Sequence, residues 1–448
     1  MLKIFLWLRY LRKKKIVSLS VIAVALSVAL LVVVSSLFNG FIDAFEKSAV
    51  HTMGDVVIFP PVKVPQYPSL IEHFEKAGVV KAATATLSGQ GLLFLSKGNV
   101  RGVTILGIDP VSRARVTGLK QSLLKQSKST TEPSFEIPGM DEKVSGFVSV
   151  GVVGQPDEKT DEYDFETIER MIGKTVTLTT GAVLTVREND STKTRIKRKV
   201  LPFTVADIVF TGVYELDKTL IYLPIDELQK KLYPDTKEPI ADKIQIKLAD
   251  DVDAELALAQ IRGLWEDFAQ KQLGWGKYLI NLTHIYTSQQ LQSQYIAELR
   301  KQMAMLLLIF GIISLSVILL ISCILYMIVI TKQKDIAIIK SCGATSGSVA
   351  FIFVGFGGCV GIIGSVIGVA LGWLVTKNIN VIEEWIRMVF GLKLWKSSVY
   401  MFSAIPNQID WESAMPIVLF AIAAAAIGAL VPAIVAAKTR PVNILRYE

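Results

Sequence analysis

Four long uncharged stretches frame one large polar block along this chain. Residues 16–38, 303–330, 349–375 and 414–437 contain no Asp, Glu, Lys or Arg. At about 1.5 Å per helical residue, each stretch exceeds the roughly 30 Å hydrocarbon core of a bilayer. We therefore predict four transmembrane helices, called spans one to four. A cleaved signal peptide is the alternative for span one, but its apolar run is longer than the about 7 to 15 residues of such a segment.

The short flanks of the spans predict their orientation. Basic residues gather in segments 1–15, 331–348 and 438–448, which the positive-inside rule places in the cytoplasm, so both termini are cytoplasmic. Residues 39–302 and the loop 376–413 then lie outside. Much of the net charge of +8 belongs to these flanks, and nothing indicates a nucleic-acid partner. The basic residues are Lys3, Arg9, Arg12, Lys13, Lys14, Lys15, Lys332, Lys334, Lys340, Lys438, Arg440 and Arg446.

The external block is predicted to be an α+β domain. Segments rich in β-branched and aromatic residues predict strands at 175–179, 203–210, 219–223 and 243–248. Asp253 is placed to cap a helix with one apolar face, formed by Ile261, Leu264, Trp265 and Phe268. Residues 120–169 are polar, and we expect long surface excursions there, part of them mobile. The block contains no cysteine, so it must fold without disulfides.

Two helical features adjoin the spans. Residues 288–302 run into span two without Gly or Pro, and Leu291, Tyr295 and Leu299 recur on one face. This predicts a rigid stalk of about 22 Å continuous with span two, with a simple connector as the alternative. In span three, Gly364, Gly368 and Gly372 repeat every four residues, which predicts close approach of another helix.

The loop between spans two and three predicts a short amphipathic helix that ends at Gly343. Ile336 and Ile339 share one face, which we expect to be presented to the cytosol. The alternative is a helix that only lies on the membrane. The residues of interest are Asp335, Ile336, Ala337, Ile338, Ile339, Gly343 and Ala344.

A basic segment at 190–199 is the other exposed feature. It is either a solvated hairpin or a protruding loop that touches another protein. Its basic residues include Lys193, Arg195, Lys197 and Arg198.

Enzyme chemistry has little support in the sequence. There is no Gly-x-x-x-x-Gly-Lys-[Ser/Thr] phosphate cradle, so this chain is expected to bind no cofactor and to leave ATP and Mg to a partner. The three histidines, His51, His73 and His284, have no metal-ligand spacing.

Several strings resemble the LolC/LolE type of ABC-transporter permease within the FtsX/MacB-like group. The run 335–339 followed by Gly343 and Ala344 resembles the family's coupling helix, with Asp335 in place of the usual Glu. Four other matches are 37–41 (Leu-Phe-Asn-Gly-Phe), 100–110 (Val-Arg-Gly-Val to Ile-Asp-Pro), 203–222 (Phe to Tyr) and the tail 445–448 (Leu-Arg-Tyr-Glu). The resemblance is nearly end to end.

The resemblance implies a multi-pass permease subunit of the bacterial inner membrane that works with a cytosolic, LolD-like ABC ATPase and a second permease copy or paralogue. Its expected cargo is lipoprotein, passed towards a LolA-like periplasmic carrier. By position, residues 181–200 correspond to the family's carrier-docking hook, although they are basic and lack proline. A MacB-like exporter of peptides or drugs and an FtsX-like regulator of a cell-wall hydrolase are the alternatives. If the cargo is acylated, we expect its entrance at Val33, Leu37, Met305 and Leu308.

Overall fold

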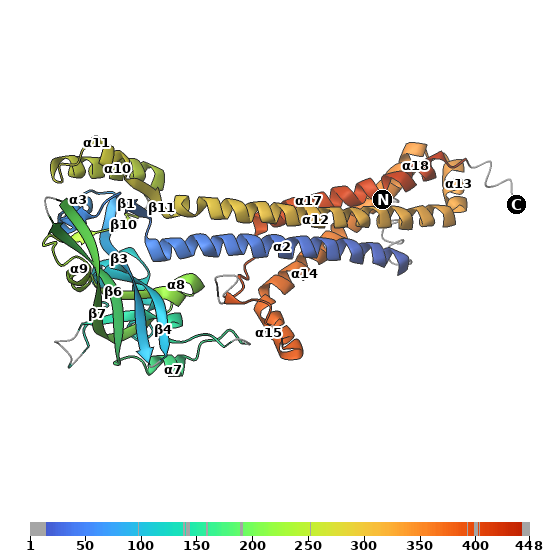
Figure 1. Cartoon of the computed structure of the whole chain (residues 1–448). Coiled ribbons are helices and arrows are strands. Elements are labelled where there is room, and N and C mark those ends of the chain that lie inside the picture. Colours follow the sequence, from blue (N-terminus) through green and yellow to red (C-terminus); the bar gives the residue numbers. More distant parts are fainter. Residues whose placement is uncertain are drawn as a thin grey trace. The chain divides into compact units, whose positions relative to one another are not determined.

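The computed structural model describes residues 15–440 except 97, 138, 140–143, 158–159, 189–190, 251, 392, 398–401 and 403. Its internal contacts divide the chain into two compact units. The membrane unit comprises Met1–Asp43, Tyr295–Trp385 and Ile405–Glu448, and the extramembrane unit comprises Ala44–Gln294 and Ile386–Ala404. Figure 1 shows the elements of both.

Four segments of the described chain are long and apolar enough to cross a membrane, as the hydropathy pattern predicts. They are α2 (Lys15–Met53), α12 (Ser288–Thr331), α14 (Ser346–Lys377) and the pair α17 (Trp411–Gly428) and α18 (Leu430–Lys438). The break between α17 and α18 at Ala429 has a local cause. Pro432 has no N–H to donate, and its ring clashes with the carbonyl four residues earlier in a regular helix.

Two of these helices extend well past their uncharged stretches. The predicted stalk and span two form one uninterrupted helix, α12, which begins at Ser288 (Figure 1). Helix α2 continues to Met53, an extension that the sequence analysis did not predict. It was missed because charges reappear after residue 39, at Asp43, Glu46 and Lys47, and we ended the span there.

The extramembrane unit is α+β, as predicted. Its main sheet has the order β11-β1-β10-β3-β4-β8-β5-β7-β6 among the described residues, and β6 also pairs with β3. Six strands, from β3 to β6 in that order, therefore close on themselves, and β10, β1 and β11 extend the sheet from β3. The strands are β1 (Val56–Phe59), β3 (Val80–Ser96), β4 (Asn99–Ile108), β5 (Ser145–Ser149), β6 (Thr175–Glu188), β7 (Ser191–Val209), β8 (Leu220–Pro224), β10 (Lys243–Leu248) and β11 (His284–Thr287), with β2 (Val64–Pro65) and β9 (Ile240–Ala241) as a separate pair.

Helices and loops cover this sheet. Helix α10 (Ala254–Lys271) begins at the predicted cap, because the Asp253 carboxylate accepts hydrogen bonds from the backbone N–H groups of Glu255 and Leu256. Ile261, Trp265 and Phe268 are buried on its inner face. The shorter helices are α3 (Tyr67–Glu75), α4 (Pro110–Val116), α5 (Leu119–Ser122), η1 (Gln126–Lys128), α6 (Val150–Val153), α7 (Phe165–Glu169), α8 (Tyr214–Thr219), α9 (Ile225–Leu232) and α11 (Lys277–Asn281).

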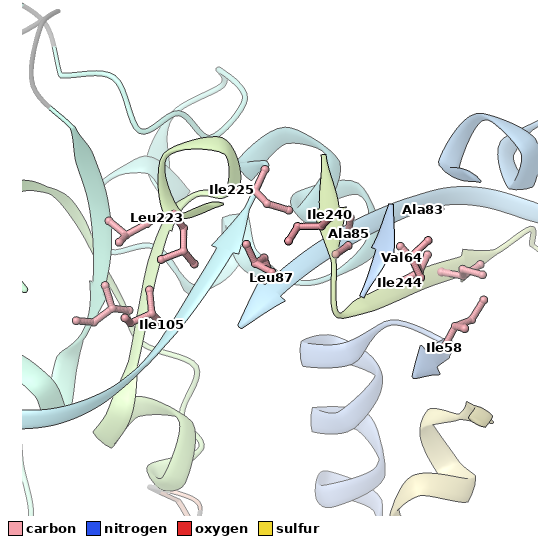
Figure 2. Packing of buried hydrophobic residues seen from close by; sticks show 14 of the residues in the cluster. Ile58, Val64, Ala83, Ala85, Leu87, Ile105, Leu223, Ile225, Ile240 and Ile244 are labelled. Atoms are coloured by element: carbon pink, nitrogen blue, oxygen red, sulfur yellow. The ribbon is translucent and has the colours of Figure 1, made fainter. Parts of the chain in front are cut away.

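A large apolar core and a smaller second cluster hold the unit together without disulfides. Figure 2 shows side chains from several strands meeting in this core, among them Leu87, Ile105 and Leu223, which are completely buried. Burying a side chain of this size contributes about 1.5 to 3 kcal/mol relative to exposure.

The prediction that residues 120–169 form surface excursions is wrong for their middle. All five residues of β5 are buried between β7 and β8, and α6 follows directly. The first part of the segment is held to β7 by the buried Asp207, whose carboxylate accepts backbone hydrogen bonds from Lys125 and Gln126. A short, largely apolar run at 146–153 marks the strand, but the polar residues on both sides of it led us to predict a surface segment.

The loop between spans three and four contains an unpredicted helix, α15 (Ile379–Phe390). The boundary between the two units falls inside it, after Trp385. The residues from Ile386 to Ala404 therefore belong to the extramembrane unit, although they lie more than 90 residues after Gln294 in the sequence.

Candidate functional site

The loop between spans two and three forms the expected short helix, α13 (Gln333–Ser341). Gly343 follows it with a φ of 97°, a left-handed conformation that favours glycine and ends the helix. Thr345 then caps α14 by accepting a hydrogen bond from the Ser348 N–H. Gly343 and Ala344 thus form the turn that the sequence pattern predicts.

The faces of α13 differ from the expectation. Ile336 is only 5% exposed and packs into the membrane unit's apolar core, and the next residue, Ala337, is fully buried. Ile338 is 52% exposed, and Asp335 lies on the outer side in an ion pair with Lys332 at 2.6 Å. The prediction that Ile336 is exposed is therefore wrong, and Ile338 is the most exposed isoleucine of this helix.

Lys340 fastens α13 to the end of span four. Its ammonium Nζ donates to the carbonyl oxygens of Ala437 and Thr439, at 2.7 and 2.8 Å. The last carbonyls of a helix have no partner within the helix and carry partial negative charge, so a cation is favourable there. This contact and the buried side of α13 attach the helix to α18 and to the apolar core of the membrane unit.

The glycines of span three allow helices to pack closely, as predicted. A Cβ at Gly368 would lie 2.7 Å from the Ala25 carbonyl oxygen of α2. Gly364 and Gly372 meet α2 in the same way, whereas Gly357 and Gly361 meet α17 and the start of α18. Helix α14 therefore uses two glycine sets for two different neighbours.

A polar knot joins the end of span one to the start of span four. The Asn39 amide donates to the Asp410 carboxylate at 2.5 Å and to the Ser413 hydroxyl at 2.9 Å. Asp410 in turn caps α17. Partial burial acts to raise the pKa of Asp410, but the hydrogen bonds from Ser413 and Asn39 hold it below its ordinary value. Gly40 completes the knot, since a Cβ there would lie 2.9 Å from the Cβ of Pro406.

The C-terminal end of α2 is held by three donors of the extramembrane unit. The Gly118 N–H, the Gln245 side-chain amide and the Arg113 guanidinium donate to the carbonyls of His51, Met53 and Thr52, at 2.7, 3.0 and 3.0 Å. These carbonyls have no intrahelical partner at a helix end. Arg113 is buried, which lowers its pKa from the ordinary value, and its cation faces the negative end of the helix dipole.

The first turn of α12 has a capping box. The Thr287 hydroxyl accepts from the Gln290 N–H at 3.1 Å, while the Gln290 side-chain oxygen accepts from the Thr287 N–H at 3.2 Å. Because Thr287 is the last residue of β11, the sheet leads into α12 without a loop. The Thr-x-x-Gln pattern could have been recognised in the sequence. The donors at the end of α2 could not, because they come from two segments far from it in the chain, at 113–118 and at Gln245.

The four predicted entrance residues do not share one cavity. Met305 and Leu308 are 67% and 63% exposed on α12, whereas Val33 and Leu37 are half-buried on α2. A cavity of about 30 Å³ does lie between α2, α12 and α17, with the hydroxyls of Ser27 and Ser314 hydrogen-bonded to each other at its wall. This volume is that of about one water molecule, so this cavity does not hold an acyl chain.

Helix α12 is the most exposed of the four candidate spans. Only 6% of its apolar window is buried within the described residues, against 50% for α2. Apolar surface on α12 is therefore left for lipid, cargo or another helix.

The basic segment 190–199 lies in a long β-hairpin. Strands β6 and β7 pair from Thr175 with Thr204 to Glu188 with Ser191, but β6 reaches β3 only at 177–180. The outer part is therefore a two-stranded ribbon. Lys197 and Arg198 are exposed, while the side chains of Lys193 and Arg195 lie outside the described part of the chain.

Two family matches cover most of the chain. Residues 17–264, more than half of it, match the MacB-like periplasmic core domain, and residues 306–441 match the FtsX-like permease C-terminal family. The chain belongs to the FtsX/MacB-like permease family. The first match spans α2 and most of the extramembrane unit, and the second spans α13, α14, α17 and α18.

Curated relatives of this permease include LolC and LolE proteins. The lipoprotein-releasing system transmembrane protein LolC of Neisseria meningitidis serogroup B is 28% identical, covering 100% of this chain and 99% of its own. A LolC of Xylella fastidiosa is 26% identical over 70% of this chain and 72% of its own. A LolE of Haemophilus influenzae is 33% identical over 27% of this chain and 29% of its own.

These matches support a permease subunit rather than an enzyme, and a multi-pass membrane protein with a periplasmic type of domain. The tail 445–448, which contributed to the resemblance, lies outside the described residues.

Proposed function

We propose that this chain is the permease subunit of an ABC transporter that releases lipoproteins from the inner membrane. A separate cytosolic ATPase of the LolD type binds and hydrolyses ATP with Mg, and a second permease, a copy or a paralogue, completes the complex. The observation that carries the proposal is full-length similarity to a LolC protein, over both the membrane and the extramembrane parts. In this topology both termini are cytoplasmic and the extramembrane unit is periplasmic.

The arrangement of α13 supports a mechanical role. Its exposed Ile338 provides an apolar contact for the ATPase, and its buried Ile336 and the Lys340 contact attach it to the spans. From there α2 and α12 lead outwards as uninterrupted helices whose outer ends are capped within the extramembrane unit. In this proposal a movement of the ATPase passes along α2 and α12 to the extramembrane unit.

The physical problem that such a transporter solves is large. A triacylated anchor has on the order of 40 CH₂ groups, and at about 0.8 kcal/mol each its exposure to water would cost about 30 kcal/mol. The chains must move between apolar surfaces. We propose that the exposed face of α12 is one of them, with Val33 and Leu37 of α2 beside the path, and that a second permease supplies the other. This is consistent with the absence of room for an acyl chain in the 30 Å³ cavity.

The β6–β7 hairpin is a candidate docking site for a LolA-like carrier. The support is its position in the chain, its ribbon-like outer part and the exposed Lys197 and Arg198. Replacing both by Glu should weaken carrier binding and leave cargo capture by α12 unchanged. Unchanged binding would remove the hairpin from the proposal.

Photo-crosslinking tests the cargo. A crosslinker at Met305 or Leu308 should capture mature lipoprotein in cells, and positions 33 and 37 should do so more weakly because they are half-buried. Ile362, 50% exposed on α14, is the matched control. Capture of soluble peptides alone at these positions would favour the exporter interpretation. Lipoprotein captured equally at Ile362 would show that the entrance lies elsewhere.

A further inference from the structure

Helix α15 presents a large apolar face that no described part of the protein covers. None of its twelve residues is buried. Val381, Trp385, Met388, Val389 and Phe390 are 61%, 68%, 76%, 59% and 70% exposed. At 3.6 residues per turn, Val381, Trp385, Met388 and Val389 fall on one side of the helix. Glu383, Arg387 and the last residue, Phe390, fall on the other. A helix of this kind in water would be expected to find an apolar partner.

The chain holds the start of α15 at the end of span three. Asn378 is the single residue between α14 and α15. The Asn380 side-chain amide also makes two hydrogen bonds with the backbone of Ile405, both at 3.0 Å. The first turn of α15 is therefore held both by the end of α14 and by the stretch of the loop that leads to α17. Since α14 and α17 are both spans, this position is a membrane surface.

Residues next to α15 are those of a bilayer interface. Near the end of α14, the Lys377 ammonium lies 5.0 Å from the ring centroid of Trp373, which is 43% exposed. At the start of α17, Trp411 is 58% exposed. Trp and Lys at span ends mark the headgroup level of a membrane. These flanks favour lipid over another protein as the partner of the apolar face, because α15 starts at that same level.

The residues after α15 grip one turn of the extramembrane unit. The Ser397 N–H and hydroxyl donate to the Asp161 carboxylate at 2.6 and 2.7 Å, and Lys393 donates to the Thr160 carbonyl at 2.6 Å. Arg387, on the polar side of α15, pairs with Glu162 at 3.1 Å. The turn 160–162 is thereby bonded to a segment that leads directly from α15.

We propose that α15 is a membrane-interface anchor, whose apolar face inserts at the headgroup–acyl boundary of the leaflet where span three ends. Arg387, Lys393 and Ser397 then tie the turn 160–162 to this helix. The partner is the lipid bilayer, recognised by the combination of large hydrophobic side chains with Trp on one side and charge on the other. This role is independent of which cargo the permease handles.

Site-specific fluorescence quenching in proteoliposomes tests the proposal with the full chain. An environment-sensitive probe is attached to Trp385→Cys or Met388→Cys after replacement of Cys323, Cys342 and Cys359. The protein is reconstituted in phosphatidylethanolamine–phosphatidylglycerol vesicles that contain lipids brominated at shallow or deep acyl positions. Glu383→Cys, two residues away and on the opposite side of the helix, is the matched control.

The anchor predicts blue-shifted emission at 385 and 388 and at least threefold stronger quenching by shallow brominated lipids than at 383. Equal quenching at the three positions, or water-like emission at 385 and 388, would overturn it. Crosslinking of position 388 to a second copy without lipid quenching would assign the face to a protein interface and also overturn it. A second measurement uses the double variant Trp385→Glu and Met388→Glu. It should raise the rate of amide hydrogen exchange at 160–162 in vesicles but not in detergent. An unchanged rate in vesicles would contradict the proposed link between α15 and the turn 160–162.

Discussion

Replacing Ile338 by a charged residue should weaken ATPase docking without affecting the folding of the permease. Ile338 is 52% exposed on α13, so burial of its free half in an interface contributes about 1 kcal/mol. An aspartate there must also be desolvated, and it lies three residues from Asp335. We expect Ile338→Asp to weaken docking by about 3 kcal/mol, which is more than a hundredfold in affinity. Ile338→Leu, which keeps the apolar contact, should bind within a few fold of the wild type.

The assay is titration of the purified ATPase onto the permease in nanodiscs, with thermal unfolding of each variant measured in parallel. Ile338→Asp should unfold at the wild-type temperature. Ile336→Asp places a charge in the packed core of the membrane unit, where Ile336 is 5% exposed, and should lower the unfolding temperature instead. Wild-type affinity in Ile338→Asp, or full stability in Ile336→Asp, would refute the reasoning about the two faces.

Three other predictions test the packing, an electrostatic group and the topology. Gly368→Ala should lower the unfolding temperature because its Cβ would lie 2.7 Å from the Ala25 carbonyl, whereas Gly358→Ala has nothing within 4 Å and should not; equal effects would contradict the packing. Burial raises the pKa of Asp217 from 3.8 to about 6, so the native state binds more protons between these values. The free energy of unfolding contributed by Asp217 should therefore fall as pH rises from about 4 to about 6, by at most about 3 kcal/mol. Thermal unfolding of the wild type and of Asp217→Asn across this pH range measures that contribution as the difference in their free energies of unfolding. A difference that grows as pH rises would show the sign to be wrong. In intact spheroplasts an impermeant maleimide should label Val200→Cys but not the native Cys342, and the reverse pattern would overturn the orientation.

The membrane unit was predictable because its signals are local. An uncharged stretch of sufficient length has few alternatives to a span, and glycines at 364, 368 and 372 do face another helix. What failed was the choice of face on α13. Ile336 and Ile339 look equivalent on a helical wheel, and only the packing of α13 on the spans shows that Ile336 points inwards.

The extramembrane unit was predictable in class but not in its connections. Strands such as β10 and the cap at Asp253 are set by neighbouring residues. The closure of β6 onto β3 and the capture of 386–404 depend on contacts between residues far apart in sequence. No local pattern encodes such contacts. The extension of α2 was missed for a different reason, because the charges at 43–47 are compatible with either a loop or a helix.

Depletion of the permease in living cells tests the central claim most directly. Cells that lose the chain should accumulate mature, acylated lipoproteins in the inner membrane fraction. Wild-type permease supplied from a second copy should restore their outer-membrane location, whereas Ile338→Asp should not. Lipoproteins that reach the outer membrane normally in depleted cells would contradict the account.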